Sequence, residues 1–203
     1  MADDHVDDPT HVQEFFGARA ADWDSRFPDD GPAYAAAVAL LGLRGGDRVL
    51  DAGCGTGRAL EPLRAAVGAD GVVIGMDLTP GCSTRHVPRA AGSGALVLGD
   101  VARLPLRAGA LDAVFAAGLI AHLPRPAENL RELARGVRPG GVLALFHPIG
   151  RAVLAARHGR TLGDDDLRAE PNLRPLLASS GWRTTSYTDR DDRFLVLAER
   201  EEG

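Results

Sequence analysis

The stretch from Val49 to Gly57 constrains the fold more than any other part of the chain, because it reads VLDAGCGTG. It combines an apolar strand, an acidic residue, three glycines at alternate positions and the start of a helix. Glycine adopts backbone angles that other residues resist, and its missing Cβ lets a ligand lie against the main chain. The pattern therefore indicates a nucleotide-like cofactor just beyond a strand, with a glycine turn that holds no ligand as the alternative.

From Gly46 onward, short β-rich runs alternate with segments of helical period, which is typical of a parallel sheet covered by helices. The fold class is therefore α/β. The last two predicted strands are close enough to pair as an antiparallel hairpin. We expect strands at 47–50, 72–76, 95–98, 111–120, 142–146, 183–188 and 194–199, and helices at 59–67, from Pro126 onward, at 149–157 and at 167–179.

Composition and charge argue against several classes of protein. The 203 residues fit one domain, residues 1–203, and a net charge of -5 is unsuited to a mainly electrostatic grip on nucleic acid. The longest apolar stretch, residues 33–43, is shorter than the ~20 residues of a membrane-spanning helix. The acidic N-terminus does not resemble a signal peptide, so we expect a cytoplasmic protein that does not bind a membrane. Cys54 and Cys82 are too few for a disulfide framework or a four-ligand zinc site, and no metal site is predicted.

Two common nucleotide-binding motifs do not fit the glycine turn. A dinucleotide fingerprint would place its third glycine at position 58, where the chain has Arg58. A phosphate-binding P-loop needs a lysine, and all 23 basic residues of the chain are arginine. Asp51 stands at the mouth of the turn, where a carboxylate repels pyrophosphate and attracts a cation or an amine.

The sequence DAGCGTG at Asp51 to Gly57 resembles motif I of the class I S-adenosylmethionine-dependent methyltransferases. The resemblance covers roughly residues 46–147 and includes the turn Arg138-Pro139-Gly140-Gly141. It implies a Rossmann-like, mostly parallel seven-stranded sheet with helices on both faces and an antiparallel C-terminal hairpin. It also implies S-adenosylmethionine as the cofactor.

The same resemblance implies which residues bind the cofactor. In the family, an acidic residue after the second strand holds the ribose hydroxyls, which corresponds to Asp77. An acidic residue after the third strand meets the adenine amine, which corresponds to Asp100, while Leu78 is a candidate for packing against the ring. The expected cofactor-binding residues are Asp51, Gly53, Gly55, Gly57, Asp77, Leu78, Asp100 and Val101.

Two histidines are the candidates for catalysis. His122 and His147 follow the fourth and fifth predicted strands, and ligands of open α/β sheets bind beyond the carboxyl ends of the strands. A neutral imidazole could remove a proton from the methyl acceptor as a general base. The alternatives are a helix-entry role for His122 and a loop hydrogen bond for His147.

The acceptor is expected to be a small molecule. The segment after the fourth strand reads GLIAHLP, without the Asn/Asp-Pro-Pro-aromatic motif of DNA amino-methyltransferases, and the chain has no Pro-Cys pair of the kind that cytosine methyltransferases use. An oxygen, nitrogen or carbon atom remains open as the site of methylation, with a natural-product intermediate of secondary metabolism as one option. The competing hypothesis is a non-catalytic cofactor-binding sensor or partner subunit, with a nicotinamide-dependent reductase third.

For two segments the sequence allows two alternative roles each. Residues 1–30 hold four aromatic side chains in an acidic arm, which could pack on the core, residues 31–203, or close over a ligand as a lid. The segment from Ile149 to Pro171, with Arg151, Arg157 and an acidic run at 164–166, could select the substrate or form a solvated connection. The oligomeric state is left open by the sequence.

Overall fold

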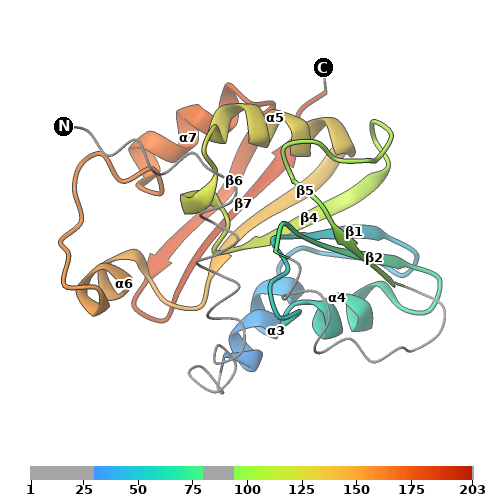
Figure 1. Cartoon of the computed structure of the whole chain (residues 1–203), viewed down its shortest axis with the longest axis horizontal. Coiled ribbons are helices and arrows are strands. Elements are labelled where there is room, and N and C mark those ends of the chain that lie inside the picture. The colour runs from blue at the N-terminus through green and yellow to red at the C-terminus, as the bar shows by residue number, and fades with distance from the viewer. Residues whose placement is uncertain (1–29, 80–93, 203) are drawn as a thin grey trace.

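The computed structural model describes residues 30–79 and 94–202. They form a seven-stranded sheet with the strand order β3-β2-β1-β4-β5-β7-β6 (Figure 1). This confirms the predicted α/β, Rossmann-like architecture. The strands are β1 (Arg48–Ala52), β2 (Val72–Asp77), β3 (Gly94–Leu98), β4 (Leu111–Ala117), β5 (Val137–His147), β6 (Trp182–Arg190) and β7 (Arg193–Arg200), and the helices are α3 (Gly31–Ala39), α4 (Leu60–Val67), the 3-10 turn η1 (Ile120–His122), α5 (Pro126–Gly136), α6 (Arg151–Arg157) and α7 (Glu170–Ala178).

The sheet reverses its direction of growth beside β1. The chain adds β2 and β3 on one side of β1 and then returns to place β4 and β5 on the other side, with all of these pairs parallel. In open α/β sheets, ligands bind outside the carboxyl ends of the strands at such a switch point. The glycine turn after β1 lies at this position.

The predicted C-terminal hairpin is confirmed. Strand β7 runs antiparallel to both β5 and β6, and the turn between β6 and β7 consists of Asp191 and Asp192. One consequence matters for the site: Phe194 of β7 pairs with His147 on one side and with Asp189 on the other. Residues on three strands are thus aligned in one row across the sheet.

The predicted end of the fourth strand is wrong. Strand β4 stops at Ala117, and the chain then turns at Gly118, whose φ is +68°, before the 3-10 turn that ends at His122. The N–H of Gly118 donates to the carbonyl of Phe146 at 2.8 Å, so the turn is fixed against the end of β5. Strand β5 is longer than predicted because Val137 already pairs with Leu111, ahead of a register shift in β4.

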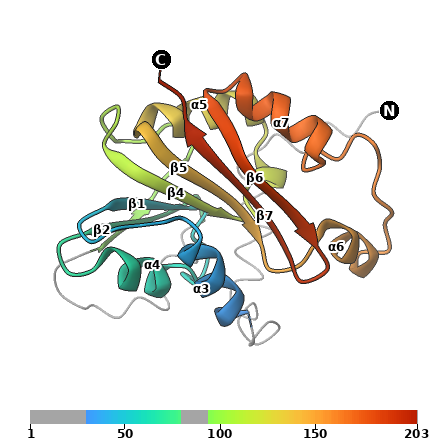
Figure 2. The ribbon, with the colours of Figure 1, turned by 180° about the vertical axis from the view of Figure 1, so that it is seen from behind.

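Helices cover both faces of the sheet (Figure 2). On one face, α5 and α7 bury leucines such as Leu133 and Leu177 in a cluster that includes Trp182, which is fully buried. The indole N–H of Trp182 donates to the carbonyl of Leu130 at 2.9 Å, so its one polar group is satisfied. On the other face, α3 and α4 pack against β-strand residues in a second cluster that includes Phe115.

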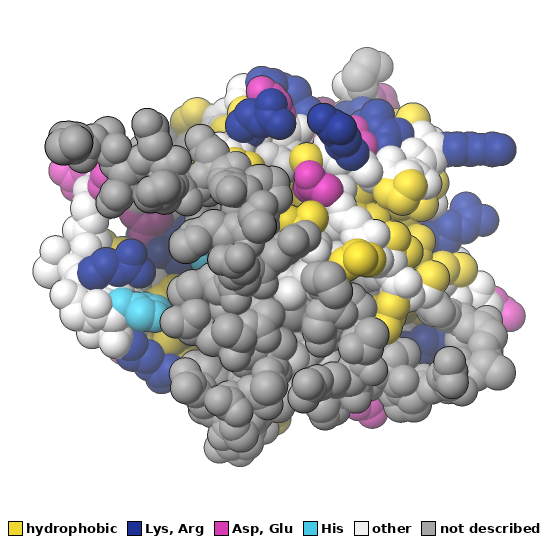
Figure 3. All heavy atoms as spheres, viewed as in Figure 1, with side chains coloured by type: hydrophobic (Ala, Val, Ile, Leu, Met, Phe, Trp, Pro, Cys, Tyr) yellow, Lys and Arg dark blue, Asp and Glu magenta, His cyan; other side chains and the backbone are white. Residues whose placement is uncertain are grey.

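The surface mixes charges of both signs. In the space-filling view of Figure 3, arginine and acidic side chains are interspersed along the upper edge, over α5. No helix within residues 30–79 and 94–202 is long and apolar enough to cross a membrane. The predicted acidic arm, apart from Asp30, lies outside the described residues, as do Cys82 and the aromatic residues of the arm.

Candidate functional site

The glycine turn is fastened to the end of β2. The backbone N–H groups of Gly53 and Cys54 both donate to the carbonyl of Met76, at 2.8 and 3.0 Å. One residue further along each segment, the N–H of Gly55 donates to Oδ2 of Asp77 at 2.9 Å. The turn and the acidic residue after β2 therefore form one connected unit.

The three glycines of the turn have positive φ angles, but they face different surroundings. A Cβ on Gly53 would lie 3.1 Å from Leu119, and one on Gly57 would lie 2.9 Å from Leu60, so both of these glycines make room for neighbouring side chains. A Cβ on Gly55, whose φ is +52°, would meet nothing within 4 Å among the described residues. Gly55 is therefore the point where a ligand can approach the backbone.

Asp51 is a buried acid beside this opening. Its residue is only 1% exposed, and its Oδ2 has no hydrogen-bond partner among the residues that the structure describes. Burial, together with the negative charge of Asp77, raises the pKa of Asp51 to about 8. A buried acid is costly to ionise when one of its oxygens has no hydrogen-bond donor, so a nearby cationic group of a ligand would stabilise the charged form of Asp51.

Asp77 already makes two backbone hydrogen bonds. In addition to the bond from Gly55, its Oδ1 accepts the N–H of Thr79 at 2.8 Å. Each carboxylate oxygen has two lone pairs, so both oxygens can accept another donor, such as a ribose hydroxyl. Sequence reasoning identified Asp77 as a ligand-binding residue but did not find its role in holding the turn.

The two predicted residues after β3 have different surroundings. Asp100 is exposed, and its Oδ1 accepts the N–H of Ala102 at 2.8 Å. Val101 is only 7% exposed, and its side chain packs in the core cluster. Asp100 borders a cavity of about 590 Å³ whose other lining residues are Ala102, Arg103, Arg125, Glu128 and Asn129.

The structure places both histidines at the carboxyl ends of β4 and β5. His147 is half-buried, and its Nδ1 lies 3.0 Å from the carbonyl oxygen of Ile149 and 3.2 Å from the N–H of the same residue. His147 therefore contacts the loop through Nδ1, and Nε2 can accept a proton in the tautomer in which Nδ1–H donates to Ile149. His122 is the last residue of the 3-10 turn after β4 and is exposed.

Both imidazoles are more acidic than usual. Loss of surrounding water lowers the pKa of His122, and the positive charge of Arg168 adds to this effect. Loss of water is also the main reason that the pKa of His147 is lowered, with Arg168 and Arg157 acting in the same direction. A histidine with a lowered pKa is neutral at physiological pH, which is the form that accepts a proton.

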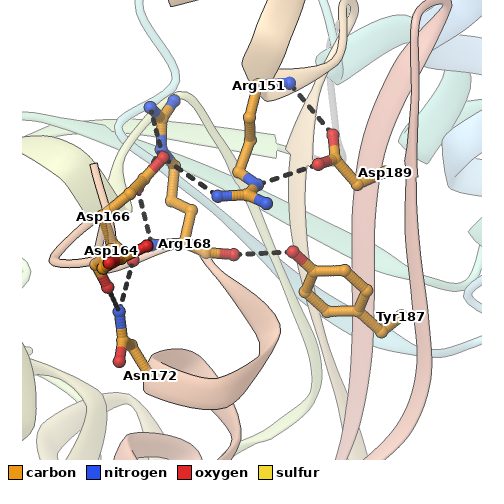
Figure 4. A network of polar contacts seen from close by, with 7 residues as sticks. All are labelled: Arg151, Asp164, Asp166, Arg168, Asn172, Tyr187 and Asp189. Carbon is orange, nitrogen blue, oxygen red and sulfur yellow. Dashed lines mark hydrogen bonds and ion pairs between the residues drawn. The ribbon is translucent and has the colours of Figure 1, made fainter. Parts of the chain in front are cut away.

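Sequence reasoning missed a network of charged residues that joins the segment after β5 to strand β6 (Figure 4). Arg151 donates through Nε to Asp189 at 2.9 Å and through Nη1 to Asp166 at 3.1 Å. Arg168 donates through Nε to the same Asp166, at 3.2 Å. The network fixes the two ends of the segment after β5 to strand β6, whereas residues 156–165 between them are exposed.

A second ion pair fixes the helix after the glycine turn. Nη1 of Arg58 lies 3.0 Å from Oδ2 of Asp30, the residue that precedes α3. Position 58 is where a dinucleotide fingerprint would need a glycine, so here the arginine takes a structural role. The ion pair therefore holds the N-terminal end of α3 next to the residue that follows the glycine turn.

Comparison with known proteins agrees with this geometry. A family model described as a methyltransferase domain matches residues 50–145. Demethylmenaquinone methyltransferase of Beutenbergia cavernae is 29% identical over 188 residues, which are 80% of this chain and 76% of that protein. Trans-aconitate 2-methyltransferase of Methylobacterium nodulans is 35% identical over 133 residues, which are 63% of this chain and 50% of that protein.

A solved structure extends the likeness to nearly the whole chain. Magnesium protoporphyrin IX methyltransferase from Synechocystis PCC 6803, with S-adenosylhomocysteine bound, superimposes with a TM-score of 0.73 at 19% identity over 96% of this chain and 100% of that one. Other relatives are longer than this protein: the chain spans 32% of an uncharacterized 37.1 kDa protein in a transposon of Streptomyces fradiae. It spans 40% of an uncharacterized protein of Mycobacterium tuberculosis. The strand order and the glycine turn, together with the match of residues 50–145 to the methyltransferase-domain model, agree with the resemblance to the class I S-adenosylmethionine-dependent methyltransferases.

Proposed function

We propose that this protein transfers a methyl group from S-adenosylmethionine to an oxygen, nitrogen or carbon atom of a small-molecule acceptor. The observation that carries the proposal is the open space beside the backbone of Gly55. The N–H of Gly55 donates to Asp77, and the buried Asp51 lies two residues before Gly53, the first glycine of the turn. This arrangement lies at the switch point of the sheet, where ligands of such folds bind.

The residues of the turn suit the parts of the cofactor. Oδ2 of Asp51, which has no partner among the described residues, would face the positively charged amino group of the cofactor. The carboxylate of Asp77 would accept the two ribose hydroxyls, since charged acceptors form the stronger hydrogen bonds. Gly55 would let the cofactor lie against the main chain. Asp100, Leu78 and the backbone of Val101 stay predicted contacts of the adenine.

The cofactor, when bound, supplies a methyl group on a positively charged sulfur. The displacement is in line, so the protein mainly has to orient the acceptor, exclude water and remove a proton from the acceptor atom. His122 and His147 could take that proton because their lowered pKa values keep them neutral at pH 7. His147 would act through Nε2 when its Nδ1–H donates to the carbonyl of Ile149.

A small-molecule acceptor fits the protein better than nucleic acid. The names of two relatives refer to small organic acceptors, demethylmenaquinone and trans-aconitate. The net charge is -5, and arginines alternate with acidic side chains on the face shown in Figure 3, whereas a nucleic-acid site needs clustered positive charge. A natural-product intermediate is among the acceptors to be tested.

The proposal is tested with S-adenosylmethionine that carries a labelled methyl group. The protein is incubated with this donor and a fractionated extract of small metabolites, and we expect label in a small-molecule fraction. Binding of S-adenosylhomocysteine is measured by calorimetry on the same sample. Binding without label in any fraction would favour the non-catalytic sensor, and the absence of binding would rule out both functions.

A further inference from the structure

The cavity beside Asp100 is bounded by two segments that are distant in the sequence. One wall is the loop after β3, with Asp100 and Arg103. The other wall is the N-terminal end of α5, with Arg125, Glu128 and Asn129. Its volume of about 590 Å³ is in the range of small-molecule sites. None of the other predicted cofactor-binding residues, all of which the structure describes, lines this cavity, so it is a separate opening next to the predicted cofactor site.

The two walls of the cavity are held together by side chains of α5 (Figure 1). Oε1 of Glu132 accepts the N–H of Leu104 at 2.9 Å. Arg135 donates to the carbonyls of Leu104 and Leu106, at 3.1 and 2.9 Å. Nε of Arg135 also lies 2.7 Å from Oε2 of Glu132, so each side chain fixes the other. The loop after β3 is thus anchored to the later turns of α5, and the cavity beside the first turn is preformed.

Asn129 brings a polar group to this cavity that no described part of the protein satisfies. The residue is 3% exposed, and its Oδ1 has no hydrogen-bond partner among the described residues. Buried polar atoms are nearly always hydrogen-bonded, so an orphaned acceptor that lines a cavity points to a ligand with an N–H donor. Asp100 on the facing wall adds a negative charge, and its only hydrogen bond within the described chain is the one from Ala102 to Oδ1. Both walls therefore favour a positively charged donor.

The same cavity also offers donors for an anion. The N–H groups of Ala127 and Glu128 have no partner in residues 30–79 and 94–202, and no side chain caps α5. Unsatisfied N–H groups at a helix N-terminus attract negative charge. The guanidinium of Arg103 is exposed and makes no ion pair with another described residue. Arg125 is paired with Glu128 at 3.1 Å, which leaves Asp100 and Arg103 as one charge of each sign.

We propose that this cavity is a second ligand site, which binds a small zwitterion with an amino group and a carboxylate, the chemistry of a free amino acid. The ammonium group of the ligand donates to Oδ1 of Asn129 and to Asp100, and its carboxylate meets Arg103 and the N-terminal end of α5. The carboxylate of Asp100 has lone pairs for both this ligand and the adenine amine, so the ligand and the cofactor bind together. The inference goes beyond methyl transfer and does not require it.

The test uses L-alanine as the probe and follows the first turn of α5 by nuclear magnetic resonance. The reporters are the backbone N–H signals of Ala127 and Glu128 and the side-chain amide signals of Asn129. L-Alanine is titrated, at constant ionic strength, into the protein alone and into protein saturated with S-adenosylhomocysteine, which fills the amino acid portion of the cofactor site. We expect a saturable shift in both samples. Ethylamine, which has only the amino group, and propionate, which has only the carboxylate, should bind more weakly.

Three variants assign the binding to named groups. In Asn129→Leu and in Arg103→Gln, the affinity for L-alanine should fall about tenfold or more, the effect of losing a charge-assisted hydrogen bond. Arg107→Gln is the matched control, because Arg107 is an exposed arginine of the same loop that does not line the cavity. Thermal unfolding separates binding from structure: Asn129→Leu should be as stable as the wild type or more stable, since leucine removes an unsatisfied polar group from a buried position.

The outcomes separate this inference from the proposed function. The second site would be overturned by the absence of a saturable shift in the wild type, by wild-type affinity in Asn129→Leu, or by equal losses in Arg103→Gln and Arg107→Gln. A shift that S-adenosylhomocysteine abolishes would place the amino acid in the cofactor site and also overturn it. Failure of the wild type to bind S-adenosylhomocysteine would overturn the proposed function, whereas the titration of the protein alone would still decide the role of the cavity.

Discussion

The carboxylate of Asp77 accepts the backbone N–H of Gly55 at 2.9 Å, although the two residues are 22 positions apart in the chain. The acid that is expected to hold the ribose therefore also fixes the one glycine of the turn that has open space beside it. A substitution at Asp77 should consequently affect the shape of the turn as well as the contact with the cofactor.

Replacement of Asp77 should weaken cofactor binding, and replacement by alanine should also lower the stability of the protein. Asp77→Asn keeps one carbonyl oxygen for a backbone N–H but loses the charge, and we expect binding to weaken by about 1 to 3 kcal/mol. Asp77→Ala removes both acceptors, so the N–H groups of Gly55 and Thr79 lose their partners and stability should also fall by about 1 kcal/mol or more. Calorimetry with S-adenosylhomocysteine and urea denaturation measure the two effects, and equal affinity in all three proteins would remove Asp77 from the site.

Gly55→Ala should reduce cofactor binding more than stability. The new Cβ would meet no atom of residues 30–79 and 94–202 within 4 Å but would project into the space assigned to the ligand. An alanine at φ +52° should cost about 1 to 2 kcal/mol of stability, the usual penalty of the left-handed region. Gly42→Ala is the matched control, because Gly42 has φ +66° and equally open surroundings before β1. Similar loss of S-adenosylhomocysteine affinity in both variants would contradict a ligand at Gly55.

Asp51 should make the cofactor-free protein less stable as the pH rises. Burial and the charge of Asp77 raise the pKa of its carboxyl to about 8 in the folded protein, from an ordinary value of 3.8. Between these pH values the folded state keeps a proton on Asp51 that the unfolded state has lost. The stabilisation that this proton provides is complete below about pH 4 and disappears as the pH rises through 8. The amide side chain in Asp51→Asn cannot ionise, so the loss of stability with rising pH that Asp51 causes should be absent in this variant.

Urea denaturation of both proteins at a series of pH values provides the measurement. The difference in free energy of unfolding between Asp51→Asn and the wild type should grow from pH 5 to pH 8, because other titrating groups are common to both proteins. A difference that does not change with pH would show that Asp51 is ionised in the folded state.

The histidines should set the acid limit of methyl transfer. Because the pKa values of His122 and His147 are lowered, either residue remains a competent base below its usual range, and the rate should fall only when the pH drops through that lowered pKa. Arg168→Gln removes a positive charge that lowers both pKa values, so the acid limb should move to higher pH. The rate is measured against pH with saturating donor and any acceptor that becomes labelled, and an acid limb that is unaltered in His122→Ala and in His147→Ala would exclude both bases.

Loss of Arg151 should destabilise the protein. Its guanidinium is 14% exposed and pairs with Asp166 and Asp189, which are 11% and 20% exposed. Arg151→Met would leave two largely buried carboxylates without this partner, and we expect a loss of about 3 kcal/mol, as when one member of a buried pair is removed. Arg174→Met breaks an exposed pair and should change stability by less than about 1 kcal/mol. Urea denaturation compares them, and equal losses would mean that the network adds no stability of its own.

The order of elements and the central motif could be predicted from the sequence, because both depend on local patterns. The alternation of apolar strands with helical periods was sufficient for the seven strands and the antiparallel hairpin, and the glycine spacing indicated the turn after β1. The end of β4 could not be predicted, since the apolar run continues to Ile120 although the backbone turns at Gly118. That turn depends on a hydrogen bond to Phe146, which is far along the chain.

The sequence by itself determined which residue types stand at the carboxyl ends of the strands: three acids, the glycine turn and two histidines. Only the tertiary structure decided that Asp51 is buried, with no partner for its Oδ2 among the described residues, that Asp77 holds Gly55, and that Arg151 and Arg168 share Asp166. The physical reason is that burial, desolvation and charge pairing depend on which segments meet in space. The segment after β5 shows this most clearly, because its arginines acquire their positions from Asp166 and from Asp189 of the C-terminal hairpin.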